Sequence, residues 1–177
     1  ESVPLPSKGA IYSPDSTVFN SETVQIKAMT ALEEDILMSQ PLIKNGTVIT
    51  ELIKSCVIDK TIDVNSLTLG DRNALMISIR ITGYGPQYDL KPKCQNCSEV
   101  NNVTVDLSGL EIKRLKIEPI EVGKNQFEFT LPVTKKKIVF QFLTGYTTKE
   151  REAKQKFYKK MTNNKRENNI TSFLEET

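Results

Sequence analysis

The residues best suited to chemistry are Cys94 and Cys97, which are separated only by Gln and Asn. Two thiolates at this spacing can share one tetrahedral zinc ion, as in a zinc knuckle. A closed structural zinc site needs four ligands, yet the sequence offers only Cys56 as a further thiol and no histidine. Cys94 and Cys97 are therefore candidate metal ligands for zinc. Cys56, a carboxylate or a second subunit would complete the site, and reduced thiols at a hairpin tip or a local disulfide remain alternatives.

The carboxylates do not form a recognisable catalytic pattern. Each lies where helix capping or a side-chain bond to a turn accounts for it. Histidine, the commonest general base near neutral pH, is absent from the whole sequence. Phosphate-binding loops and nucleophile elbows are also missing. We predict no catalytic and no cofactor-binding residue and expect a non-enzymatic protein. The carboxylates considered are Glu33, Glu34, Asp35, Asp59, Asp63 and Asp71.

Composition indicates a folded chain with no dominant charge. The 177 residues are 38% hydrophobic and 26% charged, and this length suits one domain with an appended arm. The 24 basic and 22 acidic residues nearly cancel, so we expect no nucleic-acid partner. No run approaches the roughly 20 apolar residues that span a membrane, and the first residues lack a signal-peptide profile. The odd number of cysteines favours a reducing compartment.

The first half should fold as strands followed by helices. The Pro4 to Tyr12 segment is typical of an extended arm, and the alternation after Val24 predicts a strand. A capping box, Thr30-Ala-Leu-Glu33, predicts a helix over 31–39 that Pro41 stops or redirects. Helical spacing recurs over 47–57. We expect the central core helix over 71–81, ended by the Gly83-Tyr-Gly-Pro sequence.

The second half changes to strand periodicity. Short alternating runs over 103–107, 115–119, 127–132 and 138–143 predict an antiparallel meander. A second capping box, Thr147-Thr-Lys-Glu150, predicts a helix to about Met161. From Gly145 to Asn169 eight basic residues face three acidic ones.

The predicted fold class is α+β, with a central core helix in the first half, a small antiparallel sheet in the second half and a basic C-terminal helix. Three segments are expected: 1–105 with the arm, helices and Cys-x-x-Cys hairpin, 106–145 with the antiparallel strands, and 146–177 with the basic helix. We expect them to form one compact unit with arms.

Several segments together resemble the baseplate hub assembly family of T4-like contractile-tailed bacteriophages. The resemblance covers roughly the first hundred residues, and the chain from about Asp106 onward supports it less well. Each segment alone is weakly specific, but their order and spacing are moderately specific. The segments are Pro4-Leu-Pro-Ser-Lys-Gly9 with Tyr12, Met29-Thr-Ala-Leu-Glu33-Glu34-Asp35-Ile-Leu, Gly70-Asp71-Arg72-Asn73, Arg80 with Tyr84-Gly85 and Tyr88, and Cys94-x-x-Cys97.

The resemblance implies a non-enzymatic structural or assembly component of the tail baseplate hub. Its partners would be other hub proteins in an oligomeric assembly, and its location the virion, after assembly in the host cytoplasm. No functional residues are carried over from the family. From composition and expected exposure, the contact regions should be the Pro4 to Tyr12 arm and the Lys149 to Arg166 helix. The alternative function is a zinc-knuckle nucleic-acid-binding module that uses Cys94, Cys97 and the basic helix.

Overall fold

Five α-helices and three two-stranded antiparallel sheets make up residues 1–161, the part of the chain that the computed structural model describes. This confirms the predicted α+β class. The helices are α1 (Ala31–Met38), α2 (Gln40–Lys44), α3 (Val48–Cys56), α4 (Leu69–Tyr84) and α5 (Gly145–Met161). The strands are β1 (Ser2–Pro4), β2 (Thr23–Gln25), β3 (Gln87–Leu90), β4 (Val103–Asp106), β5 (Phe127–Thr130) and β6 (Lys137–Phe140), and a 3₁₀ turn, η1, covers Leu107–Gly109.

The N-terminal segment forms the first sheet. Strand β1 pairs antiparallel with β2, with Val3 opposite Val24 and both side chains buried. A further bridge joins Ile26 to Val57 at the end of α3. The predicted strand after Val24 is therefore confirmed, and it ties the N-terminus to the helices.

Local sequence signals set the boundaries of α1, α2 and α3. The capping box of Thr30 and Glu33 is present at the start of α1, as predicted. Pro41 lies in the first turn of α2, where its missing N–H costs no helical bond, so it redirects the chain. Helix α3 matches the helix predicted over 47–57.

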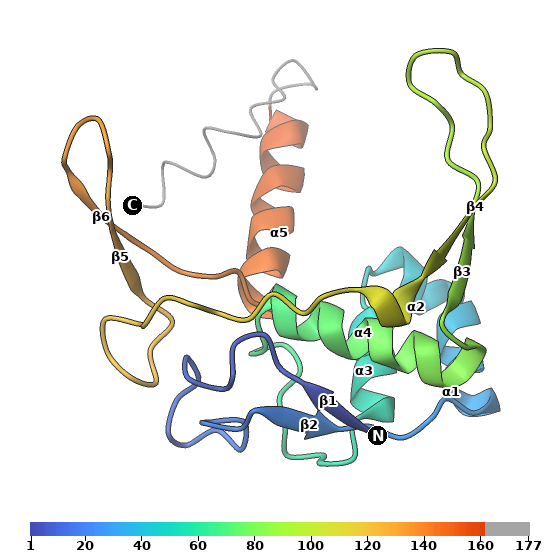
Figure 1. The fold of residues 1–177 in the computed structure, drawn as a ribbon, viewed down its shortest axis with the longest axis horizontal. Helices are drawn as coiled ribbons and strands as arrows, with labels where there is room; N and C mark the ends of the chain where they lie inside the picture. Colours follow the sequence, from blue (N-terminus) through green and yellow to red (C-terminus); the bar gives the residue numbers. More distant parts are fainter. Residues whose placement is uncertain (162–177) are drawn as a thin grey trace.

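Helix α4 is the central core helix. Its N-cap is Thr68, whose hydroxyl accepts a hydrogen bond from the Asp71 amide, and Leu75 and Ile79 are buried. The helix begins earlier than predicted and passes through Gly83. It ends at Gly85, whose φ of 80° lies in the left-handed region. In Figure 1, α4 runs across the middle of the molecule between the N-terminal sheet and the two hairpins.

The second half forms two separate hairpins, so the predicted four-strand meander is wrong. Strand β4 pairs with β3 in the predicted Cys-x-x-Cys hairpin, although no strand was predicted over 87–90, and β5 pairs with β6. Residues 115–119 form no strand. Instead the Leu115 amide donates to the Pro6 carbonyl over 2.8 Å, and Leu115 packs against the core. The alternation over 115–119 reflects one partly buried side chain, Leu115, in a segment without regular secondary structure.

Helix α5 starts two residues before the predicted capping box. Thr144 and Thr147 exchange hydrogen bonds, with the Thr144 amide donating to the Thr147 hydroxyl over 2.8 Å. Gly145 is packed tightly against Asn65 and Arg72, so a longer side chain there would collide with them. The predicted basic segment beyond residue 161 lies outside the described residues. Within those residues, no helix is both long and apolar enough to cross a membrane.

One hydrophobic core joins elements distant in sequence. It is built from β1, β2, α3, α4, the arm and the start of β5, and α1 and β6 add partly buried side chains. The three-segment division at 105 and 145 stays a prediction. The core residues are Val3, Leu5, Ile11, Tyr12, Val18, Val24, Ile26, Leu52, Ile53, Cys56, Val57, Val64, Leu67, Leu75, Ile79 and Phe127.

Candidate protein interface

The Pro4 to Tyr12 arm is part of the core, so its predicted exposure is wrong. Leu5 is 0% exposed, and Ile11 and Tyr12 are also buried. The expected extended conformation is also wrong, because residues 6–11 form successive turns, with the Lys8 amide donating to the Leu5 carbonyl and the Ala10 amide donating to the Ser7 carbonyl. This segment is therefore not a free contact surface.

Asp71 holds the arm to α4 through a buried polar cluster. Its carboxylate accepts hydrogen bonds from the Ser7 amide at 2.9 Å and the Ser7 hydroxyl at 2.6 Å, and it also accepts one from the Tyr12 hydroxyl. The same Tyr12 oxygen accepts a bond from the Thr68 amide over 3.0 Å. Burial, and then the nearby Asp71 charge, raise the pKa of the Tyr12 phenol well above its ordinary value. Its hydroxyl therefore stays a donor, and Asp71 acts structurally.

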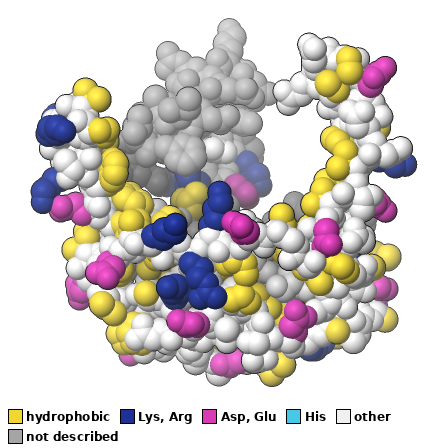
Figure 2. All heavy atoms as spheres, viewed as in Figure 1, with side chains coloured by type: hydrophobic (Ala, Val, Ile, Leu, Met, Phe, Trp, Pro, Cys, Tyr) yellow, Lys and Arg dark blue, Asp and Glu magenta, His cyan; other side chains and the backbone are white. Residues whose placement is uncertain are grey.

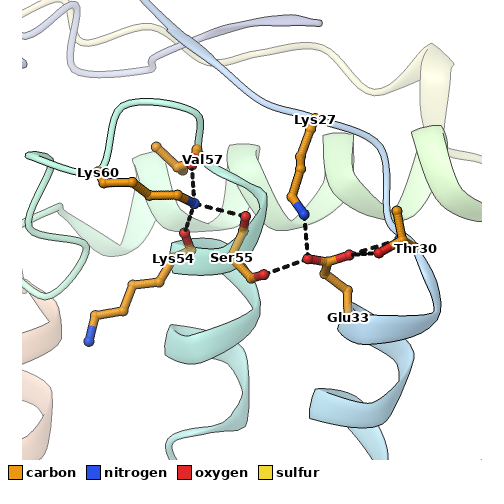
Figure 3. Close-up of polar contacts among 7 residues, drawn as sticks. All are labelled: Lys27, Thr30, Glu33, Lys54, Ser55, Val57 and Lys60. Carbon is orange, nitrogen blue, oxygen red and sulfur yellow. Dashed lines mark hydrogen bonds and ion pairs between the residues drawn. The ribbon is translucent and has the colours of Figure 1, made fainter.

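Glu33 joins α1 to α3 through a second cluster (Figure 3). Its carboxylate accepts bonds from Lys27 Nζ at 2.7 Å, the Ser55 hydroxyl at 2.5 Å and the Thr30 amide at 2.8 Å. These partners, Lys27 first, hold the pKa of Glu33 far below its ordinary value although the side chain is fully buried. Hydrogen bonds to the ionised form outweigh the cost of burying it. Glu33 therefore caps α1, as predicted, and also connects two helices.

The C-terminal end of α3 is closed by Lys60 beside this cluster. Its ammonium donates to the carbonyls of Lys54 at 2.7 Å, Ser55 at 2.9 Å and Val57 at 2.7 Å (Figure 3). A cation at this end of a helix binds the unpaired carbonyls and complements the helix dipole. Lys60 therefore caps the C-terminal end of α3.

Asp59 and Asp63 make the turn bonds that the sequence indicated. Asp59 accepts from the Thr61 amide over 2.9 Å, and Asp63 accepts from the Asn65 amide over 3.0 Å. The hydrogen bonds from Thr61 lower the pKa of Asp59, and the Thr61 hydroxyl contributes more than the amide. The carboxylates therefore serve the fold at separate places.

Cys94 and Cys97 lie together at the tip of the β3–β4 hairpin, whereas Cys56 is buried in the core on α3. The structure thus does not bring Cys56 to the pair. The amides of Cys97 and Asn96 donate to the Cys94 sulfur and lower the pKa of that thiol. Among the residues that the structure describes, no group of three or more Cys, Asp or Glu could hold a metal ion.

The β3–β4 hairpin has one apolar and one polar face. Tyr88 lies opposite Val105, and Leu90 lies opposite Val103, so these four side chains share a face. Val103 is 43% exposed, and Tyr88 and Leu90 are exposed as well. On the other face, the Thr104 hydroxyl donates to Asp89, and Gln87 donates to Asp106. We call the first side the β3–β4 apolar face.

Arg80 fixes the base of this hairpin to α4. Its guanidinium donates to the Gly85 carbonyl at 3.0 Å and lies over the rings of Tyr84 and Tyr88, 4.8 Å and 5.6 Å from their centroids. The Leu107 amide closes the base by donating to Pro86 over 2.9 Å. These contacts of Arg80 hold the hairpin at its base, and the hairpin projects from the body (Figure 1). The cation–π contacts leave both tyrosine rings partly accessible.

The β5–β6 hairpin continues from core to surface along one face. Phe127 is opposite Phe140 and Phe129 is opposite Ile138, so these side chains lie on the same face. Phe127 is buried and stacks on Phe140 with ring centroids 5.5 Å apart, but Phe129 is 51% exposed. We call the exposed outer part, Phe129 and Ile138, the β5–β6 apolar face. The opposite face carries the Lys137 to Glu128 ion pair.

Both hairpins rise on the same side of the molecule, one on each side of α5 (Figure 1). Hydrophobic side chains gather on the edge of each hairpin that faces the other hairpin (Figure 2). Exposed apolar side chains grouped on projecting elements are typical of surfaces that another protein covers. The two apolar faces are therefore the candidate interface.

The extended segment 110–116 crosses α4 between the bases of the hairpins and borders two open grooves. A groove of about 570 Å³ is lined by Lys113, Arg114 and Lys116 together with Leu69 and Phe142. A second groove of about 410 Å³ lies along Ala74, Ile77 and Ile81 of α4. The grooves share Pro6, Gly70 and Lys113, so they form one concave strip on this side of α4.

A family model of T4 bacteriophage base plate proteins matches residues 5–176 of this chain. The chain belongs to the T4 bacteriophage base plate protein family. Searches of the curated proteins and of the solved structures found no significant match. The family assignment confirms the resemblance at the level of a T4-like baseplate protein. In this base plate protein, the projecting apolar faces are the surfaces to test for contacts with neighbouring proteins.

The sequence patterns did not reveal the two apolar faces. Strand β3 has only four residues, too few for its alternation to stand out. Phe129 and Ile138 had been placed in strands but not on a shared exposed face. The partner register, which a single strand does not reveal, makes each face visible.

Proposed function

We propose that this base plate protein is a non-enzymatic structural or assembly component of the tail baseplate hub. It binds other hub proteins through the β3–β4 and β5–β6 apolar faces. Its location is the virion baseplate, after assembly in the host cytoplasm. The observation that carries the proposal is the presence of two anchored hairpins that expose apolar faces in a chain of this family.

Apolar surface removed from water contributes roughly 25 cal/mol per Å², so an uncovered face loses stabilisation that a partner can supply. Each hairpin is rigid at its base, through Arg80 in one case and Phe127 in the other. A partner that covers these faces therefore orders little additional chain, which favours stable association.

The carboxylates support a structural role. Glu33 and Asp71 are fully buried among partners, and Asp59 is bonded in a turn. The family favours this function over the nucleic-acid alternative. The predicted contact region Lys149 to Arg166 stays a prediction, and its part beyond residue 161 lies outside the described residues.

Co-purification from phage-infected cells tests the proposal. We expect tagged protein to bring down hub proteins, and the double variant Leu90→Ser with Val103→Ser to retain about a tenth of them or less, because central apolar contacts dominate an interface. The matched control, Asp89→Ser with Thr104→Ser, alters the polar face of the same strand pair and should retain them.

Circular dichroism would establish that both variants keep their helix content. Recovery of outer baseplate proteins without hub proteins would contradict the hub assignment. Equal recovery by the apolar-face and polar-face variants would contradict the assigned surface.

A further inference from the structure

We propose that the tip of the β3–β4 hairpin is half of a tetrahedral zinc site. Cys94 and Cys97 supply two thiolates, and the same residues of a second copy of the chain supply the other two. The ion would join two hairpin tips and make a symmetric dimer. This inference is independent of which baseplate proteins the chain contacts.

The backbone of the tip already has the shape of a zinc knuckle. The Cys94 amide donates to the Glu99 carbonyl over 2.8 Å, and the Ser98 amide donates back to the Cys94 carbonyl over 3.0 Å. Ser98 has a φ of 63°, a left-handed conformation that non-glycine residues seldom adopt. This turn folds Cys97 back beside Cys94, where both side chains can point at one ion.

Backbone amides support the negative charge that a metal-bound thiolate carries. The N–H groups of Asn96 and Cys97 both point at the Cys94 sulfur. Successive amides that converge on one atom form a small anion-binding concavity, as in several metal-sulfur sites. A loop that contained two thiols without a shared role would not need two amides to point at one sulfur.

Both thiols are free and accessible. The cysteines form no disulfide, Cys97 is exposed and Cys94 is half-buried. An isolated bridge between Lys93 and Val100 extends the hairpin up to the tip. The tip therefore lies far from the body, where a second molecule can approach it without a collision between the two bodies (Figure 1).

We place the missing ligands in another molecule. A structural zinc site takes four ligands, and the described residues contain no group of three or more Cys, Asp or Glu that could hold a metal ion. The Glu99 carboxylate accepts a hydrogen bond from Cys97 Sγ over 3.9 Å, so even with it the tip would lack a fourth ligand. The sequence contains no histidine, and Cys56 is enclosed in the core. A second identical tip supplies the two thiolates that are needed through a two-fold contact of one surface with itself.

Charge also favours the second copy. A zinc ion with four thiolates carries two negative charges. Each tip contributes Lys91 and Lys93 against Glu99, which leaves one positive charge per copy, so two tips balance the site. All three side chains are exposed, so they can adjust around the ion.

Zinc stoichiometry and oligomeric mass test the proposal on the purified, reduced chain. After addition of zinc and removal of the excess, we expect one zinc per two chains by elemental analysis. Light scattering should show twice the monomer mass, and EDTA should return the monomer. Cobalt(II) in place of zinc should give tetrahedral absorption with sulfur-to-metal charge transfer at the intensity of four thiolates.

Variants assign the ligands. Cys94→Ser with Cys97→Ser should abolish both metal binding and the zinc-dependent mass, and an exposed tip leaves the fold intact as judged by circular dichroism. Cys56→Ala is the control and should keep one zinc per dimer. Loss of zinc in Cys56→Ala with a native spectrum would overturn the ligand assignment.

Two results would overturn the shared site: one zinc bound per monomer, or no zinc retained by the reduced protein. Zinc retained only when a baseplate protein from infected cells is added would assign the missing ligands to that protein and reject the second copy. Because the test uses the isolated chain, its failure leaves the hub contacts untouched. Loss of co-purification, conversely, leaves the zinc stoichiometry unaffected.

Discussion

Tyr12 connects three parts of the molecule with one oxygen atom. It donates to Asp71 and accepts from the Thr68 amide, and all three residues are buried. A buried amide or carboxylate that loses its partner keeps the cost of leaving water. The contribution of this hydroxyl should therefore exceed that of a tyrosine bonded at the surface.

Tyr12→Phe should lower the free energy of unfolding by about 2 kcal/mol, because it leaves the Thr68 amide without its partner and removes one donor from Asp71. Tyr146→Phe is the matched control, since its hydroxyl also bonds an aspartate, Asp63, over 2.6 Å but in an exposed position. Urea unfolding followed by circular dichroism measures both. Equal losses in the two variants would show that burial of the cluster contributes nothing.

Glu33 should give the protein a specific acid sensitivity. Its folded-state pKa is depressed, so its ionised form adds stability that is complete above the ordinary glutamate pKa of about 4.3. This stability is lost progressively as the pH falls below that value. Lys27 contributes most to the lowered pKa but is partly exposed, so solvent screens some of the ion pair, and the Ser55 hydroxyl and the Thr30 donors share the effect.

Glu33→Gln should cost about 2 kcal/mol at pH 7 and flatten the decline of stability below about pH 4.3, because the variant has no carboxylate to protonate. Asp35→Asn serves as the control, since Asp35 is exposed on the same helix. Urea midpoints at a series of pH values measure both. If the urea midpoint of Glu33→Gln fell with pH in parallel with that of the unmodified protein, the result would contradict this role of Glu33.

At the scale of elements, the surroundings of two glycines distinguish turns that share one backbone conformation. Gly9 and Gly46 have nearly equal φ values of 71° and 68°. A Cβ on Gly9 would come within 2.4 Å of the Val18 carbonyl oxygen, whereas one on Gly46 would meet nothing within 4 Å. The first turn is enclosed by backbone and the second is open.

Gly9→Ala should therefore destabilise by more than about 3 kcal/mol or prevent folding, since two backbone segments would have to separate. Gly46→Ala carries only the left-handed strain of about 1 kcal/mol. The difference between the two urea midpoints isolates the steric part. A Gly9→Ala protein as stable as Gly46→Ala would mean that the 18–21 turn moves without cost.

The elements show which interactions sequence patterns could predict. Helices α1, α3 and α4 were predicted because their caps and apolar spacing are local. The meander failed because strand pairing depends on a partner, and β3 carried too little alternation to reveal one. The prediction that the arm is exposed was wrong for the same reason, because its burial depends on distant residues. The bonds of Ser7 and Tyr12 reach Asp71 across 64 and 59 residues, and no local signal announces them.

For the whole molecule, the body and the β3–β4 hairpin should differ in local stability. The body contains the buried core, whereas the hairpin has exposed strands and is held only at its base. Regions with few buried contacts open with less free energy than a core helix. The molecule is thus a stable centre with less protected projections.

Hydrogen exchange should show this contrast. We expect the amides of β3 and β4 to exchange orders of magnitude faster than those around Leu75 and Ile79 in α4. Their exchange should slow when hub proteins are bound, while α4 changes little. Uniform protection throughout the free protein would contradict the division, and an unchanged hairpin in the complex would contradict its role as a contact.

The core joins Val3, near the start of the chain, to Phe127, far along it. During synthesis on the ribosome the N-terminal strand, the arm and α4 emerge long before the aromatic residue that completes their packing. Until then, the newly made polypeptide exposes surface that the finished protein conceals. Translation arrest before Phe127 should therefore leave a protease-sensitive nascent chain, and release of a few dozen further residues should make it resistant.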